Sequence, residues 1–187
     1  MKRHLINLAL KGFLIFAFMG ACSALAGDLY SQTKFPVPHL DGAKAYLGLL
    51  EDQKDFALAE INAEVIIVEV FSVDCRKCKG SVKKYNKLYE LIQTKGLSDK
   101  IKFIGIGIGN SDAEIKLFQK QYEAIFPLCP DPDSKSYRMV GHVSIPYIMV
   151  FKKDAGGGLT KVYSKEREPR EADAFLKDIL SMTGLTQ

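Results

Sequence analysis

The sequence predicts an α/β fold in which helices cover both faces of a central mixed β-sheet. Two segments, 65–71 and 101–108, are almost entirely apolar, which is typical of strands buried on both sides in a sheet. Each is followed by a segment whose apolar residues recur every three or four positions, the period of a helix packed along one side. Two later strands joined by a glycine-rich turn come next, and a last helix follows them. This order of strands and helices along the chain favours a sheet with helices on both faces.

The length and composition agree with one folded domain that carries a short appendage. The 187 residues are 47% apolar and 26% charged, which is enough to bury a core and too balanced for a disordered or coiled-coil chain. The formal charge of +4 comes mostly from Lys2, Arg3 and Lys11, because the first 26 residues contain no acid and the remainder carries +1. The bulk charge therefore gives no reason to expect nucleic-acid binding.

The first 26 residues have the pattern of an export signal. A basic start and an apolar stretch precede Ala24, Leu25 and Ala26, the small-x-small pattern at which signal peptidase cuts. Two alternatives stay open: Cys22 follows a sequence similar to a lipobox and would be lipidated, or residues 5–26 remain as an uncut membrane anchor. All three interpretations place the folded part in the periplasm or another extracytoplasmic compartment.

The rest of the chain is predicted to form an N-terminal extension, residues 27–58, and a domain, residues 59–187. Residues 27–40 contain two prolines and little periodicity, so we expect an extended lead-in. Asp41 is placed to cap a helix whose apolar residues continue as far as Phe56, although Gly48 weakens that helix.

The first strand of the domain leads directly into a pair of cysteines. Cys75 and Cys78 follow it, and then a helix begins whose apolar residues recur at helical spacing from Val82 to Ile92. Alternate glycines occupy the second strand, 101–108, but they lack the final glycine of a dinucleotide-binding loop. We interpret them as positions where a helix packs closely against the strand.

The second half of the domain also contains patterns that predict helices and strands. Ser111 and Glu114 form a capping-box pattern, which predicts a helix through about Tyr122. The other predicted elements follow in order: a short extended piece at 126–129, a short helix at 134–140, strands at 147–151 and 159–164, and a closing helix at 171–180.

Three cysteines remain once the export signal is set aside, and an odd number leaves at least one unpaired. Cys75 and Cys78 are so close in sequence that a bond between them constrains the unfolded chain little, so a purely structural disulfide explains them poorly. Cys129 most resembles a small buried core residue, since free cysteine is commonly buried, and the alternative is a third redox thiol.

These residues together resemble the thioredoxin fold. The resemblance rests on the buried strand that runs into CxxC at a helix start and on Ile145-Pro146 just before the hairpin, and it covers roughly residues 60 to 182. The lead-in, the segment FPLCPDPD and the exported setting are most similar to the TlpA/ResA/CcmG group. The resemblance implies a thiol-disulfide oxidoreductase that acts on cysteines of other exported proteins, with cytochrome c maturation as one use and a membrane protein as electron donor. It implies a redox-active disulfide and neither a metal nor another cofactor.

The two cysteines have different roles in this chemistry. Thiol-disulfide exchange needs one exposed thiolate to attack and a second thiol to release the mixed disulfide. Cys75 would lie at the first turn of the helix, where free N–H groups and the helix dipole favour a thiolate. We therefore assign Cys75 as nucleophile and Cys78, buried one turn later, as resolving thiol.

Charges around the pair predict a tuned reactivity. Arg76 and Lys77 place positive charge at a helix start, where the dipole prefers acids, and they would stabilise a Cys75 thiolate. Asp74 opposes that effect, so the net direction of tuning stays open. For the later lysines of this helix we favour a solvated helix face: Lys83, Lys84 and Lys87.

Two further site residues follow from the resemblance. The proline that matches Pro146 is cis in the thioredoxin family, and the backbone of the residue before it, here Ile145, pairs with an incoming peptide. A trans proline that starts a strand is the alternative. Glu69 matches a buried acid that moves the proton of the second cysteine, so it is a candidate general base for Cys78. Its alternative is a solvent-facing glutamate near a strand end.

Three other functions stay open from the sequence. Cys75, Cys78 and His142 supply the ligand types with which copper-delivering thioredoxin-fold proteins hold Cu(I), and zinc would also accept them. Those proteins usually space their cysteines by three residues, however. A peroxiredoxin-like thiol peroxidase is the second alternative, although Ser72 stands where that class has threonine. A redox-inert binding domain is the third.

Overall fold

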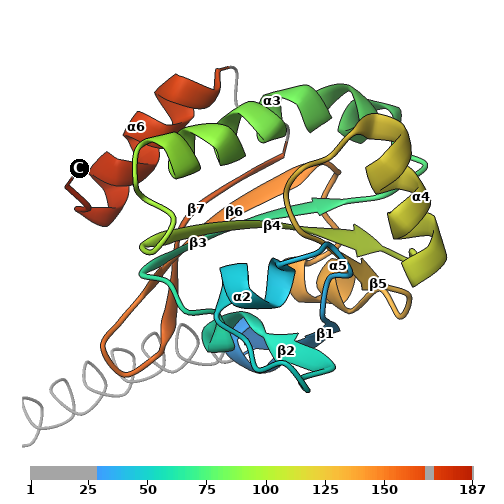
Figure 1. Cartoon of the computed structure of the whole chain (residues 1–187), viewed down its shortest axis with the longest axis horizontal. Coiled ribbons are helices and arrows are strands. Elements are labelled where there is room, and N and C mark those ends of the chain that lie inside the picture. The colour runs from blue at the N-terminus through green and yellow to red at the C-terminus, as the bar shows by residue number, and fades with distance from the viewer. Residues whose placement is uncertain (1–28, 167–170, 187) are drawn as a thin grey trace, which may run out of the picture.

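A five-stranded mixed sheet forms the centre of the molecule (Figure 1). The computed structural model describes residues 29–166 and 171–186. The strand order is β5-β4-β3-β6-β7; β3, β4 and β5 are parallel, and β6 and β7 are each antiparallel to the strand before them in this order. The strands are β3 (Val65–Phe71), β4 (Ile101–Ile108), β5 (Leu128–Asp131), β6 (Tyr147–Lys153) and β7 (Leu159–Glu166). The predicted α/β thioredoxin-like fold is therefore confirmed.

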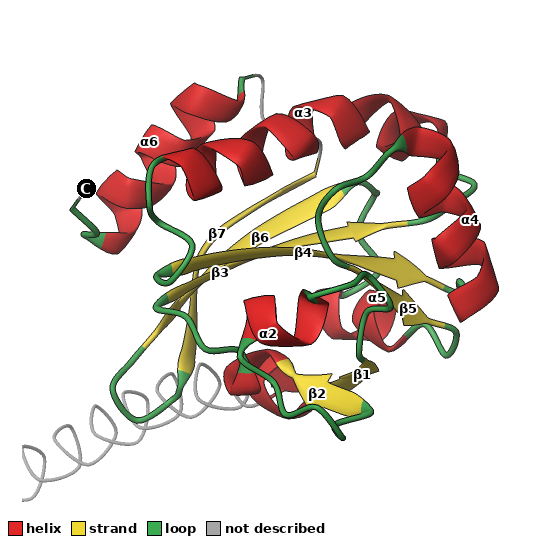
Figure 2. Cartoon of the chain, viewed as in Figure 1, coloured by secondary structure: helices red, strands yellow, loops and turns green. Residues whose placement is uncertain are grey.

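Helices cover both faces of this sheet (Figure 2). We call one side the α3 face; it is covered by α3 (Arg76–Thr94), α4 (Asp112–Tyr122) and α6 (Ala172–Thr183). The opposite side, the extension face, is covered by α5 (Lys135–Val140) and by elements of the extension. Those elements are β1 (Lys34–Pro36), α2 (Ala43–Leu47), β2 (Asp55–Ala57) and the short 3-10 helix η1 (Leu58–Glu60).

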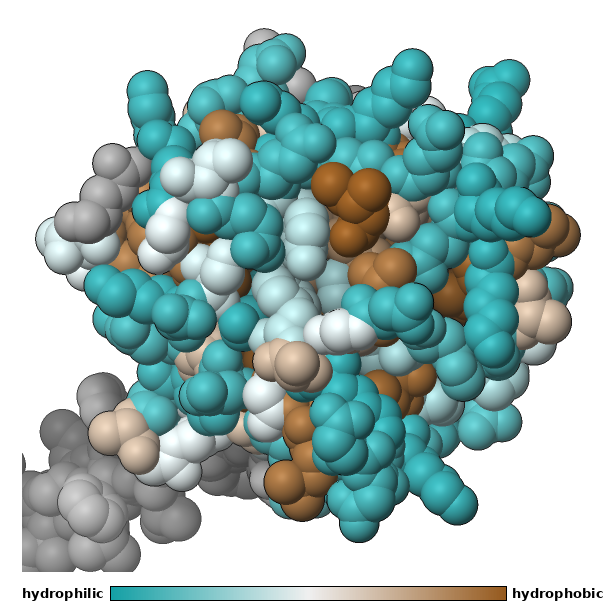
Figure 3. Space-filling view, in the orientation of Figure 1, coloured by the Kyte–Doolittle hydropathy of each residue, from teal (hydrophilic) through white to brown (hydrophobic). Residues whose placement is uncertain are grey.

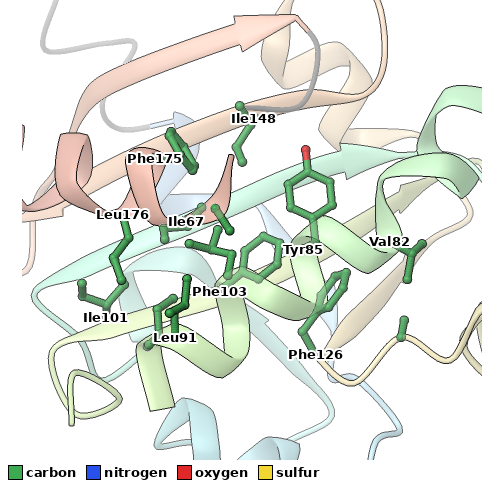
Figure 4. Packing of buried hydrophobic residues seen from close by; sticks show 14 of the residues in the cluster. Ile67, Val82, Tyr85, Leu91, Ile101, Phe103, Phe126, Ile148, Phe175 and Leu176 are labelled. Atoms are coloured by element: carbon green, nitrogen blue, oxygen red, sulfur yellow. The ribbon is translucent and has the colours of Figure 1, made fainter. Parts of the chain in front are cut away.

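The all-apolar pattern of β3 arises because both of its faces are buried. Ile67 and Phe71 point into the core of the α3 face, and Val68 and Val70 into that of the extension face, as alternation along a strand requires. The rings of Phe103 and Phe126 stack in the first of these cores with centroids 4.6 Å apart, beside Tyr85 of α3 (Figure 4). This packing fixes α3 against the strands.

The glycines of β4 make room for neighbouring elements. A Cβ atom added at Gly107 would collide with Ile115 of α4, and one added at Gly105 would come within 2.6 Å of Leu128 in β5. The predicted close approach of a helix is confirmed at Gly107, whereas Gly105 makes room for a side chain of the neighbouring strand.

The extension departs from its prediction. The helix expected to run from Asp41 to Phe56 ends at Leu47, because Gly48 takes a left-handed conformation with φ of 72°. The N–H groups of Gly48 and Leu49 then donate to carbonyls of the last turn, those of Ala45 and Lys44. Phe56 lies instead in β2, which pairs with β1 inside the lead-in expected to be extended. Residues 29–32 of that lead-in are helical.

The short extended piece predicted at 126–129 is a strand of the main sheet. β5 pairs with the carboxyl half of β4 at the edge, where Pro130 needs no partner for its missing N–H. On the side away from β3, no strand among the described residues pairs with the amino half of β4. Tyr46 of the extension covers this edge: its hydroxyl accepts a hydrogen bond of 2.9 Å from the N–H of Phe103. Burial raises the pKa of Tyr46.

The export signal predicted for residues 1–26, together with Cys22, lies outside the described residues. Within 29–166 and 171–186, no helix is both long enough and apolar enough to cross a membrane.

Candidate active site

Cys75 and Cys78 form a disulfide at the point where β3 passes into α3. Their Cα atoms are 5.2 Å apart. Cys75 is the N-cap residue of α3, and its Sγ accepts a hydrogen bond of 3.1 Å from the N–H of Cys78. The Cys75 side chain is partly exposed, whereas Cys78 is 1% exposed and belongs to the core of the α3 face. The predicted arrangement of an accessible sulfur above a buried one is therefore present.

The loop before Cys75 is held by a residue that the sequence analysis missed. Asn110, which follows the end of β4 and is 4% exposed, accepts a hydrogen bond of 3.0 Å on its side-chain oxygen from the N–H of Val73. The N–H of Cys75 donates to the carbonyl of Ser72 at 3.1 Å. β3 and β4 are parallel neighbours, so their carboxyl ends meet at one edge of the sheet. The signal that could have identified Asn110 is its place as a polar residue just after the second buried strand.

Ile145 and Pro146 come to the same place from another part of the chain. The Ile145–Pro146 peptide bond is cis, which confirms the expectation from the resemblance; the trans alternative is wrong. The carbonyl oxygen of Ile145 lies 3.9 Å from Sγ of Cys75. The backbone just before β6 therefore forms one wall of the entrance to the disulfide.

Glu69 lies in the middle of β3 and is only 3% exposed. Alternation along the strand places it on the same face as Ile67 and Phe71, the face that also contains Cys78. The solvent-facing alternative for Glu69 is therefore wrong, and the carboxyl group is inside the layer between β3 and α3.

Exposed charged side chains, two of them positive, flank Cys75. Arg76 and Lys77 are exposed in the first turn of α3, and that turn contains no acidic residue. Asp74 is exposed on the other side of Cys75. A cleft of about 190 Å³ lies next to this loop, between Val73, Asp74 and Lys79 on one side and a face of α4 on the other. α3 begins at the end of the molecule where α4 lies (Figure 1).

Cys129 is on the opposite side of the sheet. It is a free thiol with no exposed surface, packed in the core of the extension face, and burial raises its pKa well above the ordinary value. A thiolate is the reactive form of cysteine. The interpretation of Cys129 as a buried core residue is confirmed, and its position argues against a third redox thiol.

His142 does not join the cysteines. It is exposed, and its ring packs against Tyr137 with centroids 4.5 Å apart. In the part of the chain that the structure describes, no three or more His, Cys, Asp and Glu side chains are grouped so that they hold a metal ion. The Cu(I) or zinc site suggested for Cys75, Cys78 and His142 is therefore not assembled.

Comparisons with known proteins agree with this site. A model of the family described as thioredoxin-like matches residues 62–156, which include the cysteine pair and Pro146. The thiol-disulfide oxidoreductases named ResA from Bacillus thuringiensis and Bacillus anthracis are each 22% identical over 126 residues, which cover 67% of this chain and 69% of the relative.

Solved structures show the same fold. StoA from Bacillus subtilis superposes with a TM-score of 0.55 and 14% identity, covering 79% of this chain and 97% of that one. A secreted disulfide oxidoreductase of Mycobacterium tuberculosis superposes with a TM-score of 0.57 and 12% identity, covering 82% and 98%. The chain therefore belongs to the thioredoxin-like family and is a thiol-disulfide oxidoreductase of the TlpA/ResA/CcmG group.

Proposed function

We propose that this protein is exported and exchanges its Cys75–Cys78 disulfide with cysteines of other exported proteins. The observation that carries the proposal is that Cys75 is partly exposed at the start of α3, while Cys78, one turn later, is buried. A partner sulfur approaches Cys75 and not Cys78, so attack and release are assigned to different cysteines.

The exchange proceeds in two steps. In the reduced protein, the Cys75 thiolate attacks a disulfide sulfur of the partner; a Cys75–partner bond forms, and the partner's other sulfur leaves as a thiolate. The Cys78 thiolate then attacks Sγ of Cys75, which releases the second partner thiol. The pair has lost two electrons and the partner has gained them, and the reverse sequence oxidises a partner dithiol.

The first turn of α3 stabilises the attacking group. The N–H of Cys78, which already donates to Sγ of Cys75, would donate to a thiolate more strongly, and the free N–H groups of the turn add to it. Arg76 and Lys77 tune the thiolate by their charge, while Asp74 acts in the opposite direction.

The other site residues serve binding and proton transfer. The carbonyl of Ile145 lies beside Cys75, where it can accept a hydrogen bond from the backbone of a partner held in an extended conformation. Pro146 directs that backbone toward the site. Glu69, buried on the face that contains Cys78, takes the proton of the resolving thiol as general base.

The proposal also covers where the protein acts and what it is used for, namely export and cytochrome c maturation. The amino-terminal signal pattern supports export, and disulfide chemistry persists best outside the cytoplasm. One structural neighbour is described as secreted. We propose cytochrome c maturation as one use, and a membrane protein as the donor that reduces the pair again.

Trapping of the mixed disulfide tests the proposal. In Cys78→Ser the resolving thiol is absent, so the bond between Cys75 and a partner should persist and be isolated from extracytoplasmic fractions of a bacterial host that expresses the full chain. We expect partner proteins that are released by dithiothreitol and identified by mass spectrometry. The matched control, Cys75→Ser, should trap none. Equal recovery from both variants, or partners from the cytoplasm alone, would contradict the proposal.

A further inference from the structure

A line of cations runs along α3 from the redox site. Arg76, Lys83 and Lys87 are spaced by seven and four residues, so they lie on one side of the helix. That side is directly opposite the buried one, whose centre is marked by Tyr85 and Ile92. All three side chains are exposed, and we call them the basic stripe.

Ion pairs do not neutralise the basic stripe in the part of the chain that the structure describes. None of its three members has an ion-pair partner there, whereas Lys34 and Lys116 are paired with Glu60 and Asp112 at 3.3 and 2.9 Å. The first acidic residue of α3 is Glu90, which follows the stripe on the same side of the helix, three residues after Lys87.

This arrangement costs stability. Like charges four residues apart, as at Lys83 and Lys87, repel each other on a helix. Cations near a helix N-terminus oppose the dipole. A local arrangement that opposes folding, in a stretch of helix without an acidic residue from Arg76 to Tyr89, is typical of a functional surface.

The surface over the stripe is open. Gly80 lies on the same side of α3 between Arg76 and Lys83, and a Cβ atom added there would meet nothing within 4 Å. In the space-filling view, hydrophilic side chains predominate along the upper rim of the molecule, which α3 forms together with α6 (Figure 3). At about 1.5 Å per residue, Lys83 and Lys87 are about 12 and 18 Å from Cys75 along the helix.

We propose that the basic stripe binds acidic residues which flank the reacting cysteine of the exchange partner. The inference rests on the proposed function, because a partner whose sulfur reaches Cys75 necessarily lies over the first turn of α3, where the stripe begins. Charged groups attract over about 10 Å at 0.1 M salt, so acids a few residues from the partner cysteine are within reach of the stripe. The attraction speeds association and weakens as salt is added.

Reduction of two synthetic peptides tests the inference. Each peptide has one cysteine capped as a mixed disulfide with 2-mercaptoethanol. In one peptide the cysteine is flanked on both sides by aspartate and glutamate, and in the other by asparagine and glutamine. The reduced protein, freed of excess reductant, should reduce the acidic peptide about tenfold faster at low salt. The ratio should fall toward one in 0.5 M NaCl.

Charge reversal locates the effect. Lys83→Glu/Lys87→Glu should abolish the preference for the acidic peptide. Lys95→Glu/Lys100→Glu changes the charge equally, but at exposed positions beyond the far end of α3, and should preserve the preference. Equal rates for both peptides in the wild-type protein would overturn the inference, as would an equal loss in both variants. Binding of anionic vesicles through Lys83 and Lys87 without any peptide preference would assign the stripe to a membrane instead and would also overturn it.

A neutral substrate separates the two proposals. Hydroxyethyl disulfide carries no charge, so all three proteins should reduce it at the same rate. If wild-type protein reduces it but shows no preference between the peptides, the inference fails and the proposed function stands. If it reduces neither hydroxyethyl disulfide nor the peptides, the proposed function itself fails.

Discussion

Each face of the sheet buries a cysteine, but one of these two cysteines is part of a disulfide and the other is a free thiol. Cys78 on the α3 face and Cys129 on the extension face are almost equally buried, at 1% and 0% exposed. Cys78 is bonded to Cys75, which reaches the surface at a helix start, whereas Cys129 is free and enclosed. The difference teaches that position at the junction of β3 and α3, rather than burial or residue type, makes a cysteine reactive here.

The largest expected effect is the loss of disulfide exchange when Cys75 is replaced, and it tests the difference between the two faces of the sheet directly. Cys75→Ser should lower the rate of disulfide exchange by about a thousandfold or more, because the nucleophile is gone. Cys129→Ser should leave the rate within about twofold, although it places a hydroxyl in an apolar core and lowers stability. Reduction of hydroxyethyl disulfide measures both. A comparable loss of rate in a folded Cys129→Ser protein would contradict the separation of the faces.

Glu69→Gln tests the proton transfer assigned to the α3 face. Loss of a general base should slow release of the mixed disulfide by about a hundredfold, while the first attack by Cys75 stays close to the wild-type rate. Rapid mixing with a chromophoric disulfide separates the two steps. An unchanged release rate would show that Glu69 has only a structural role.

Tyr46→Phe perturbs the extension alone. The hydroxyl that accepts from the Phe103 N–H is lost at the open edge of β4, so the free energy of unfolding should fall by about 1 to 2 kcal/mol. Tyr89→Phe, which removes the hydroxyl of the tilted ring that packs beside Tyr46, is the matched control and should cost under about 0.5 kcal/mol. Urea unfolding compares them. Exchange activity should be unchanged in both, and a loss of activity would show that the extension supports the site.

The smallest expected effect concerns charge at the mouth of the site. Replacing Arg76 and Lys77 by Gly and Pro should raise the pKa of the Cys75 thiol and lower the reduction potential, because the thiolate loses nearby positive charge. Proline is tolerated in a first helical turn. Thiolate absorbance against pH measures the shift, with Lys95→Ala as a distant control. Unchanged values would reject a tuning role.

The elements that position the redox pair were predictable, and the supporting ones were not. β3, α3 and β4 are long and strongly patterned, so their burial is visible in the sequence. The extension is built from elements of three to five residues, and Gly48 ends α2 where the apolar pattern continues. Such short elements depend on tertiary contacts.

The same distinction holds within the site. Cys75 and Cys78 are only three positions apart and were assigned from their spacing at a predicted helix start, and Pro146 came from the resemblance. Asn110 was missed because its role is a single hydrogen bond to Val73 across two parallel strands. Glu69 left two interpretations open until the structure showed it in mid-strand with both neighbouring strands present.

The equilibrium between the Cys75–Cys78 disulfide and defined dithiothreitol and glutathione buffers tests the central claim most directly. Trapping of free thiols should show one two-electron transition that disappears in Cys78→Ser and persists in Cys129→Ser. A potential near or below about −250 mV would identify a reductant, and one near about −120 mV an oxidant. A pair that does not interconvert with either buffer would contradict the assignment of this protein's function to its cysteine pair.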